Sequence, residues 1–289
     1  MPIRRLNTRS IQKMHPVRDH RKIVYTIACS EFSFDAARAM ELAFFRTFAV
    51  PSISKVLYDT GKFLHATQCR IDDTDILLSE ILESGYDGPR GKRAIARINR
   101  IHSEFNLTNI DLLYVLTTFV VEPIKWMKRF AWRPLLDVEE EALYHFWVEV
   151  GRRMNIQDIP KTLDSFLAFN LKYESDYFEY TDENHQLAVV TRQHLLSHFL
   201  PEALFPFGAP LFHAFLDTPL LEACGLPPAS RKLTWSLEQS MRLRSQLASF
   251  RRQTTKHRTE VPIQSYPDGY VIEQVGGQSW STNAPSEKS

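Results

Sequence analysis

Apolar positions recur at helical spacing along most of the chain, whereas the alternation typical of strands is sparse. Capping residues, Pro and Gly bound these stretches, as they do at the ends of helices. The pattern predicts helices over residues 35–48, 52–58, 72–85, 89–105, 110–129, 137–154, 162–177, 184–200, 210–223 and 230–257. The connections are short, and no Gly/Ser linker occurs before residue 258. We therefore expect one all-α domain of about ten helices.

The two ends of the chain differ from this helical middle. Residues 1–14 form a basic arm, which resembles an organellar transit peptide only faintly, and residues 15–258 form the predicted domain. Residues 259–277 are a C-terminal extension, and the polar residues 278–289 are typical of a disordered tail. No run of 18 uncharged apolar residues occurs. We expect a cytoplasmic protein without a transmembrane segment, with peripheral membrane contact left open.

Charge and motif content exclude several functions. The 289 residues carry 35 basic and 34 acidic side chains, so the basic excess of a nucleic-acid-binding protein is missing. The three cysteines are far apart in sequence and indicate neither a disulfide framework nor a cysteine zinc site. Glycine-rich nucleotide loops and the nucleophile motif of serine hydrolases are also absent.

His102 is the clearest candidate for chemistry. On a helical wheel it falls on the same face as Ile95, Ile98 and Phe105, so its imidazole points with apolar side chains. Such a histidine is commonly a hydrogen-bonded core residue, but it can also be a ligand to a buried metal or haem iron. Asn99 and Asn106, three positions before and four after it, are predicted to lie beside the ring.

Two further segments combine polar groups with an apolar context. The predicted helix 110–129 contains Thr117, Thr118 and Glu122, and the carboxylate next to Pro123 needs a partner, most simply an arginine. The segment 65–74 brings Arg70 together with acidic and hydroxyl groups just before a helix. Taken alone, this second segment is explained more simply by helix capping and a solvated arginine.

His194 and His198 have a spacing that can chelate zinc. The glutamate of the common HExxH motif is missing, and the sequence identifies no third ligand. A zinc hydrolase therefore ranks last among the alternative functions that we consider.

An ordered set of motifs resembles the family of mpaB-type oxygenases and the rubber oxygenase latex clearing protein, over about residues 15–270. The motifs are Thr60-Gly-Lys-Phe63, Arg70-Ile-Asp-Asp-Thr74, Pro89-Arg-Gly91, Arg97-Ile-Asn-Arg-Ile-His102, Asp111-Leu-Leu-Tyr-Val-Leu-Thr-Thr-Phe119, Glu122-Pro-Ile-Lys-Trp126, Trp132-Arg-Pro134 and Glu149-Val-Gly-Arg152. The resemblance implies an all-α fold around haem b and the O₂-dependent cleavage of an isoprenoid carbon–carbon double bond. It also implies that His102 is the iron ligand.

The chain departs from this family pattern in places. Latex clearing protein has arginines at the positions of Asn99 and Asn106, and its distal basic residue matches only loosely, in the region 67–70. We expect a smaller lipophilic substrate than rubber. Arg70 and Thr118 are the candidates for steering oxygen, and Arg97 and Arg133 for pairing with the haem propionates.

The sequence thus predicts a haem b-dependent oxygenase whose partners are O₂ and a small lipophilic molecule. A haem-dependent dehydrogenase or hydroxylase of a small natural product is the alternative on the same scaffold. A haem-binding helical protein without turnover is the alternative of another class. Polar groups facing the haem pocket would favour an enzyme, whereas a wholly apolar pocket would favour a binder.

Overall fold

The computed structural model describes residues 8–250 and 257–277, and the regular structure in these ranges is helical. The predicted all-α class is therefore confirmed. The α-helices are α1 (Thr8–Ile11), α2 (Pro16–Thr26), α3 (Ser33–Arg46), α4 (Pro51–Asp59), α5 (Lys62–His65), α6 (Thr67–Ser84), α7 (Pro89–His102), α8 (Asn109–Phe130), α9 (Asp137–Arg153), α10 (Leu163–Tyr177), α11 (Asp182–Ser197), α12 (Phe205–His213), α13 (Thr218–Ala223) and α14 (Arg231–Phe250). A π-helix, η1 (Ile27–Glu31), and short 3₁₀ turns, η2 (Thr47–Ala49), η3 (Glu202–Leu204), η4 (Arg258–Glu260) and η5 (Ile272–Gln274), connect or follow them.

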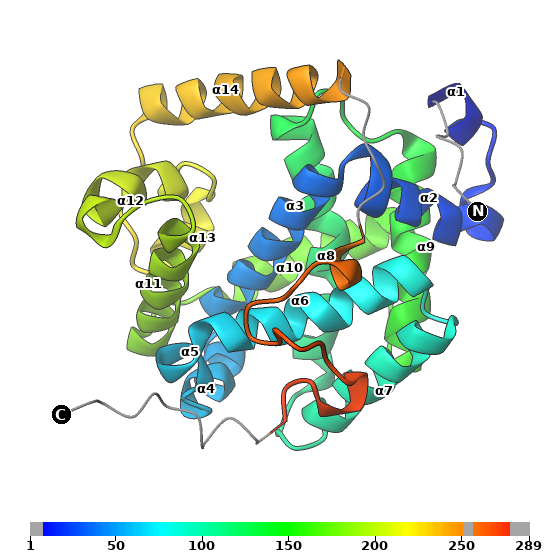
Figure 1. Ribbon diagram of the computed structural model, residues 1–289, viewed down its shortest axis with the longest axis horizontal. Coiled ribbons are helices and arrows are strands. Elements are labelled where there is room, and N and C mark those ends of the chain that lie inside the picture. Colours follow the sequence, from blue (N-terminus) through cyan, green and yellow to red (C-terminus); the bar gives the residue numbers. More distant parts are fainter. Residues whose placement is uncertain (1–7, 251–256, 278–289) are drawn as a thin grey trace.

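Helix α8 lies at the centre, where α3, α9, α10 and α14 pack against it (Figure 1). Its sequence is apolar on nearly every side, which is the pattern of a helix surrounded by others. Thr108 caps its first turn by accepting the backbone N–H of Asp111 at 3.2 Å. The helix then runs without interruption through Pro123 to Phe130.

Several helix boundaries differ from those predicted; α6, for example, begins at Thr67 rather than at residue 72, so the segment 65–74 lies mostly inside a helix. The helix predicted over 89–105 ends at His102. The segment predicted as one helix, 210–223, lies in α12 and α13, because Asp217 caps α13 by accepting the backbone N–H of Leu220 at 3.2 Å. Helix α14 is described only to Phe250, so its predicted end at 257 lies outside the described residues.

The sequence pattern does not predict helix α2. In the structure this helix packs along α9. It carries three basic side chains, Arg18, Arg21 and Lys22, which interrupt its apolar pattern, but Ile23 and Val24 are fully buried. Ile11 in α1 is also buried in the main core, so part of the predicted basic arm packs against the domain. The predicted tail, 278–289, lies outside the described residues.

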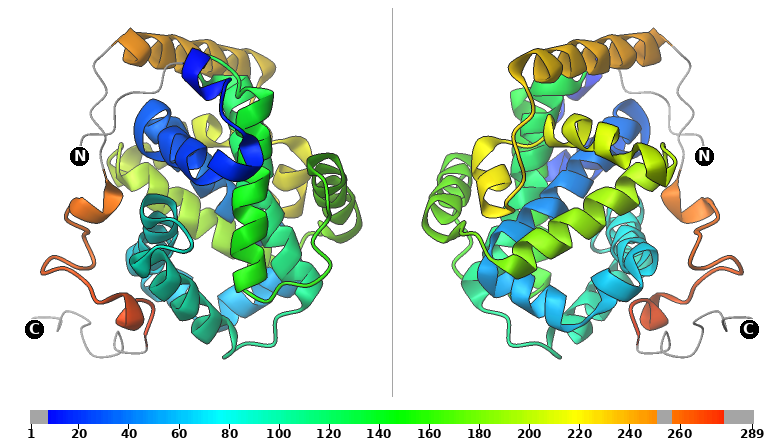
Figure 2. Two further views of the ribbon diagram at one scale, coloured as in Figure 1. Left: turned by 90° about the vertical axis from the view of Figure 1, so that its right-hand side faces the viewer. Right: turned by 90° about the vertical axis from the view of Figure 1, so that its left-hand side faces the viewer.

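The predicted C-terminal extension corresponds to residues 257–277, which we call the C-terminal segment. It crosses α6 and reaches α7 on the outside of the helices (Figures 1 and 2). Its side chains Ile263, Ile272 and Val275 are buried. Ser265 donates its hydroxyl to Asp72 at 2.7 Å, and Tyr270 donates to Glu80 at 2.6 Å. The segment is therefore attached to the domain by both apolar and polar contacts.

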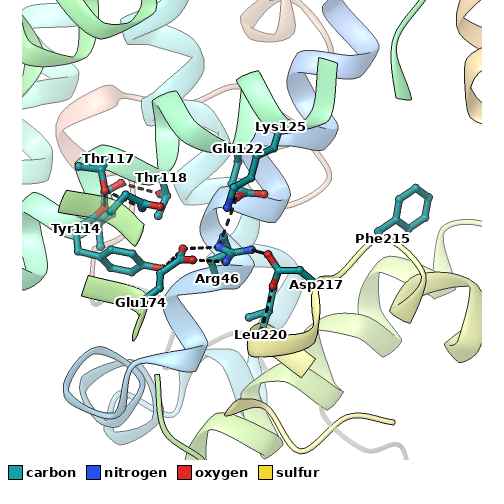
Figure 3. Close-up of polar contacts among 12 residues, drawn as sticks. Arg46, Tyr114, Thr117, Thr118, Glu122, Lys125, Glu174, Phe215, Asp217 and Leu220 are labelled. Carbon is teal, nitrogen blue, oxygen red and sulfur yellow. Dashed lines mark hydrogen bonds and ion pairs between the residues drawn. The ribbon is translucent and has the colours of Figure 1, made fainter. Parts of the chain in front are cut away.

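A buried arginine joins four elements of the fold (Figure 3). Arg46, at the end of α3, donates to Glu174 of α10 at 2.6 and 2.7 Å and to Asp217 at 2.8 Å. Glu122 of α8 lies 3.5 Å from the same guanidinium and 3.2 Å from Lys125. Burial alone would lower the pKa of Arg46, but the three carboxylates raise it well above its usual value. The predicted pairing of Glu122 with an arginine is thus confirmed.

We predict that Arg46→Met destabilises the protein by about 3–5 kcal/mol, because it leaves buried carboxylates without their cation. Lys55→Met is the matched control, since Lys55 forms an exposed ion pair with Asp59 and should contribute at most about 1 kcal/mol. Urea unfolding of both variants measures the difference. Equal losses in the two variants would contradict the structural role of Arg46.

Candidate functional site

A mostly apolar cavity of about 220 Å³ lies between α4, α6, α7, α8 and α9. Its apolar lining comes from the side chains of Phe44, Ile53, Val56, Leu57, Leu77, Leu78, Ile81, Ile98, Ile101, Phe105, Leu107, Leu112, Val115, Leu116, Phe119, Trp147, Val150, Met154 and Ile156. Phe119 and Trp147 stack in this wall with ring centroids 4.7 Å apart. Such a lining suits a lipophilic molecule.

His102 lies in the wall of this cavity, at the last residue of α7. Helix α7 begins at Pro89, and Ala94 and Ile95 on its apolar face are buried in the core. Within the part of the chain that the structure describes, no hydrogen bond satisfies the His102 ring. Burial, and secondly the positive charge of Arg70, lower the pKa of His102 to about 4. Its imidazole is therefore neutral near pH 7, which is the form that binds a metal.

Arg70 and Thr74 of α6 line the same cavity. They are four residues apart and thus share one helix face, where Arg70 Nη1 donates to the hydroxyl of Thr74. The guanidinium lies 5.4 and 5.2 Å from the ring centroids of Phe44 and Phe63. Burial lowers the pKa of Arg70, but an arginine remains protonated in proteins. Among the described residues, no carboxylate oxygen lies within 4.0 Å of this cation.

Further polar groups of the lining were not singled out from the sequence. Lys62 of α5, Asp73 of α6 and Asp111 of α8 all reach the cavity. Tyr266 donates to Asp73 at 2.5 Å, and Tyr173 donates to Asp111. Burial raises the pKa of Asp73, although the bond from Tyr266 opposes this. The spacing of Asp73 three residues after Arg70 was the available signal for its position.

The structure places the other predicted site residues outside the cavity lining. Thr118 is buried, but its hydroxyl donates to the Val115 carbonyl at 2.7 Å, one turn back in α8. Arg97 is also buried and donates to the Val275 carbonyl at 2.6 Å. Arg133 forms ion pairs with Glu31 and Glu139, both at 2.7 Å. These hydroxyl and guanidinium groups are engaged in holding the fold together.

The two asparagines do not flank His102 as predicted. Asn99 donates its amide to the Arg153 carbonyl at 2.9 Å and so connects α7 to the end of α9. Asn106 is exposed and lies beyond the end of α7, so the helical spacing that placed it beside His102 does not apply. The early end of the helix explains the position of Asn106, whereas Asn99 lies within α7 and its amide donates to the Arg153 carbonyl instead.

His194 and His198 lie together at the end of α11, with ring centroids 4.9 Å apart. His198 is exposed and contacts the amide of Gln68 at 3.4 Å. Across residues 8–250 and 257–277, no group of three or more His, Cys, Asp or Glu side chains has an arrangement that could hold a metal ion. The structure thus brings no third ligand to this pair.

A second, larger cleft of about 410 Å³ lies beside Arg46. It is lined by Trp126, Phe130, Phe215 and several charged side chains. Most of these charges have partners, as in the ion pair of Arg129 with Glu238 at 2.5 Å. The cleft contains no histidine or cysteine, so His102 makes the smaller cavity the candidate site.

No helix among the described residues is both long and apolar enough to cross a membrane. This finding concerns the helices in residues 8–250 and 257–277 alone.

Comparison with known proteins now places this chain in a family. Residues 49–251 match the family described as "ER-bound oxygenase mpaB/B'/Rubber oxygenase, catalytic domain". The chain is 30% identical to the ER-bound oxygenase mpaB of Penicillium roqueforti over 211 residues, which are 67% of this chain and 70% of that protein. It is 29% identical to the ER-bound oxygenase mpaB' of Penicillium brevicompactum, over 67% of this chain and 50% of that protein. With its all-α fold and most of its length matched, the chain belongs to the family of the mpaB and rubber oxygenase catalytic domain.

Proposed function

We propose that this protein is a haem b-dependent oxygenase that acts on a small lipophilic substrate, with O₂-dependent cleavage of a carbon–carbon double bond as its reaction. The observation that carries the proposal is the His102 imidazole, which is neutral, has no hydrogen bond within the described part of the chain and lines an apolar cavity. Membership in an oxygenase family supports it.

The residues present fit a haem. A neutral imidazole on a rigid helix is a common axial ligand, and apolar walls suit the faces of a porphyrin. His102 would hold the iron, and a bound haem would supply the dioxygen chemistry that side chains lack. The apolar lining of α4, α7 and α8 would exclude water and hold the lipophilic substrate.

Arg70 and Thr74 are the polar residues of the cavity lining to which we assign a role in the reaction. Their hydrogen bond fixes the guanidinium against the cavity wall, where its remaining N–H groups can stabilise negative charge that develops on oxygen during the reaction. Since Arg70 remains cationic, it donates these bonds throughout the reaction without itself changing protonation state. Thr74, unlike Thr118, lines the cavity; its hydroxyl accepts from Arg70 Nη1 and donates to the Arg70 carbonyl at 3.3 Å, so we assign it the positioning of Arg70.

A non-catalytic haem-binding protein is less well supported. A carrier that only holds haem needs an apolar pocket and an axial ligand, and a buried cation in the pocket wall would be unfavourable without a function. Four charged side chains, those of Lys62, Arg70, Asp73 and Asp111, line this cavity. The polar lining therefore favours an enzyme. The same fold can host cleavage, hydroxylation or dehydrogenation, and product analysis separates these reactions.

We predict that the purified protein binds one haem b per chain and that His102→Ala abolishes or shifts its Soret band. The reason is that the variant loses the nitrogen that would bind iron. Absorbance spectra of the ferric and ferrous forms, recorded beside a melting curve, measure this effect. His198→Ala and Asn106→Ala are the controls, because both residues are exposed and outside the cavity lining. An unchanged spectrum in His102→Ala would remove this residue from the site.

We also predict that the His102 ring of the haem-free protein stays neutral from pH 8 down to about pH 5. Burial disfavours its charged form, and the NMR titration should give a pKa of about 4. The unfolded chain has the ordinary value of 6.5, so between these two values it binds the proton that the folded chain excludes. Stability therefore falls as the pH is lowered from 6.5 to 4, and His102→Gln should make this fall shallower. A titration midpoint near 6.5 is the result that speaks against the buried, neutral ring.

A further inference from the structure

One end of the His102 cavity is completed by the C-terminal segment, which lies beyond the matched residues 49–251. Gly276 lines the cavity there. The preceding Val275 is fully buried, and its carbonyl is held by Arg97 at 2.6 Å. Contacts between η5 and α7 fix the same stretch. The buried side chain of Val275 and the hydrogen bond to its carbonyl therefore fix the neighbouring Gly276 at the cavity wall.

The site requires a glycine at this position. Gly276 has a φ of +70°, a left-handed conformation that favours glycine. A Cβ atom there would lie 3.1 Å from Cδ1 of Ile101 and 3.6 Å from Oδ2 of Asp73. The backbone of Gly276 also hydrogen-bonds to the Asp73 carboxyl group. The chain thus passes close to the polar end of the cavity without filling it.

Lys62 is bound at this point. Its Nζ donates to the carbonyl of Gly276 at 3.2 Å, across 214 positions of sequence. An ammonium group has three N–H donors, and this is the one hydrogen bond of the Lys62 side chain found in the described residues. Within the same residues, no carboxylate oxygen lies within 4.0 Å of it. Lys62 therefore has donors left for a further acceptor.

Among the described residues no carboxylate forms an ion-pair contact with Lys62 or Arg70, although the nearby Asp73 attracts both cations electrostatically. Arg70 lines the cavity as a second cation without an ion pair among the described residues. The two acids of the lining are each bound by a tyrosine hydroxyl, Asp73 by Tyr266 and Asp111 by Tyr173. A cation inside a protein is stabilised best by an anion that also accepts its hydrogen bonds. The cavity therefore holds two cations and two acids in a mostly apolar lining, and within the described residues both cations keep hydrogen-bond donors that no carboxylate occupies.

We propose that Lys62, positioned by the C-terminal segment, forms with Arg70 a binding site for a carboxylate at this end of the cavity. The ligand class is an apolar molecule that ends in a carboxylate. Two sources share this chemistry: the acid group of a lipophilic substrate and a propionate of haem. The inference deepens the proposed function, because it names the end group that the cavity binds, but its binding test does not require the haem.

The first arm of the test measures the binding of farnesoic acid and farnesol to the full, haem-free chain by calorimetry. These probes share one apolar chain and differ in their end group. A charge-assisted hydrogen bond predicts that the acid binds about tenfold or more tightly than the alcohol. Lys62→Met should remove this preference, and Lys62→Arg should restore it. Lys92→Met is the matched control, since Lys92 is exposed on α7 and outside the cavity lining.

The second arm titrates haem b and its dimethyl ester, in which the propionates carry no charge, into the same variants. Tighter binding of haem than of the ester, lost in Lys62→Met, together with no preference for farnesoic acid, would assign the site to a propionate. A preference for the acid in a chain that takes up no haem would leave the carboxylate site standing while the haem proposal fails. If neither pair of ligands is distinguished, or if Lys62→Met preserves the discrimination, the carboxylate site is overturned. Melting temperatures of all variants show whether Lys62→Met still folds.

Discussion

Arg46 carries a permanent positive charge in the interior, and the arrangement of the central helices depends on neutralising it. Carboxylates from α8, α10 and the start of α13 surround its guanidinium at the end of α3. Tyr114 adds a hydrogen bond to Glu174 at 3.2 Å. Because separating any of these elements would leave a charge without a partner in a poorly polarisable interior, the cluster fixes α3 and α8 relative to each other. The same two helices extend to the His102 cavity through Phe44 and Val115.

The cavity combines apolar walls with charged and titratable side chains. Its apolar walls make a charge unfavourable, and this lowers the pKa of both His102 and Arg70. The imidazole responds by remaining neutral, while the guanidinium keeps its charge and is stabilised by Thr74 and two aromatic rings. In the proposed function, the neutral imidazole would bind the haem iron and the guanidinium would stabilise negative charge. Their different chemistry in one cavity follows from their different intrinsic basicity.

The C-terminal segment shows that the site is larger than the matched family region. Residues 49–251 contain His102, Arg70 and Thr74, but the wall at Gly276 comes from beyond them. The segment is held there by buried Ile272 and Val275, by the acids of α6 and by Arg97 of α7, so its position is tied to the helix that carries His102.

The sequence by itself determined the helical class and most helix positions, because apolar spacing and capping residues act locally. It also determined that His102 lies on an apolar helix face and that Glu122 needs a cation. Tertiary structure alone decided where α7 ends, and hence that Asn106 leaves the site. It also decided that Asn99 binds the end of α9, because that contact depends on how α7 packs. It decided that Thr74 rather than Thr118 lines the cavity, because the packing of α6 turns the face of Thr74 toward this space, whereas Thr118 is buried in α8. No local sequence pattern predicts the contact of Lys62 with Gly276, because the packing of the whole chain brings these two distant residues together.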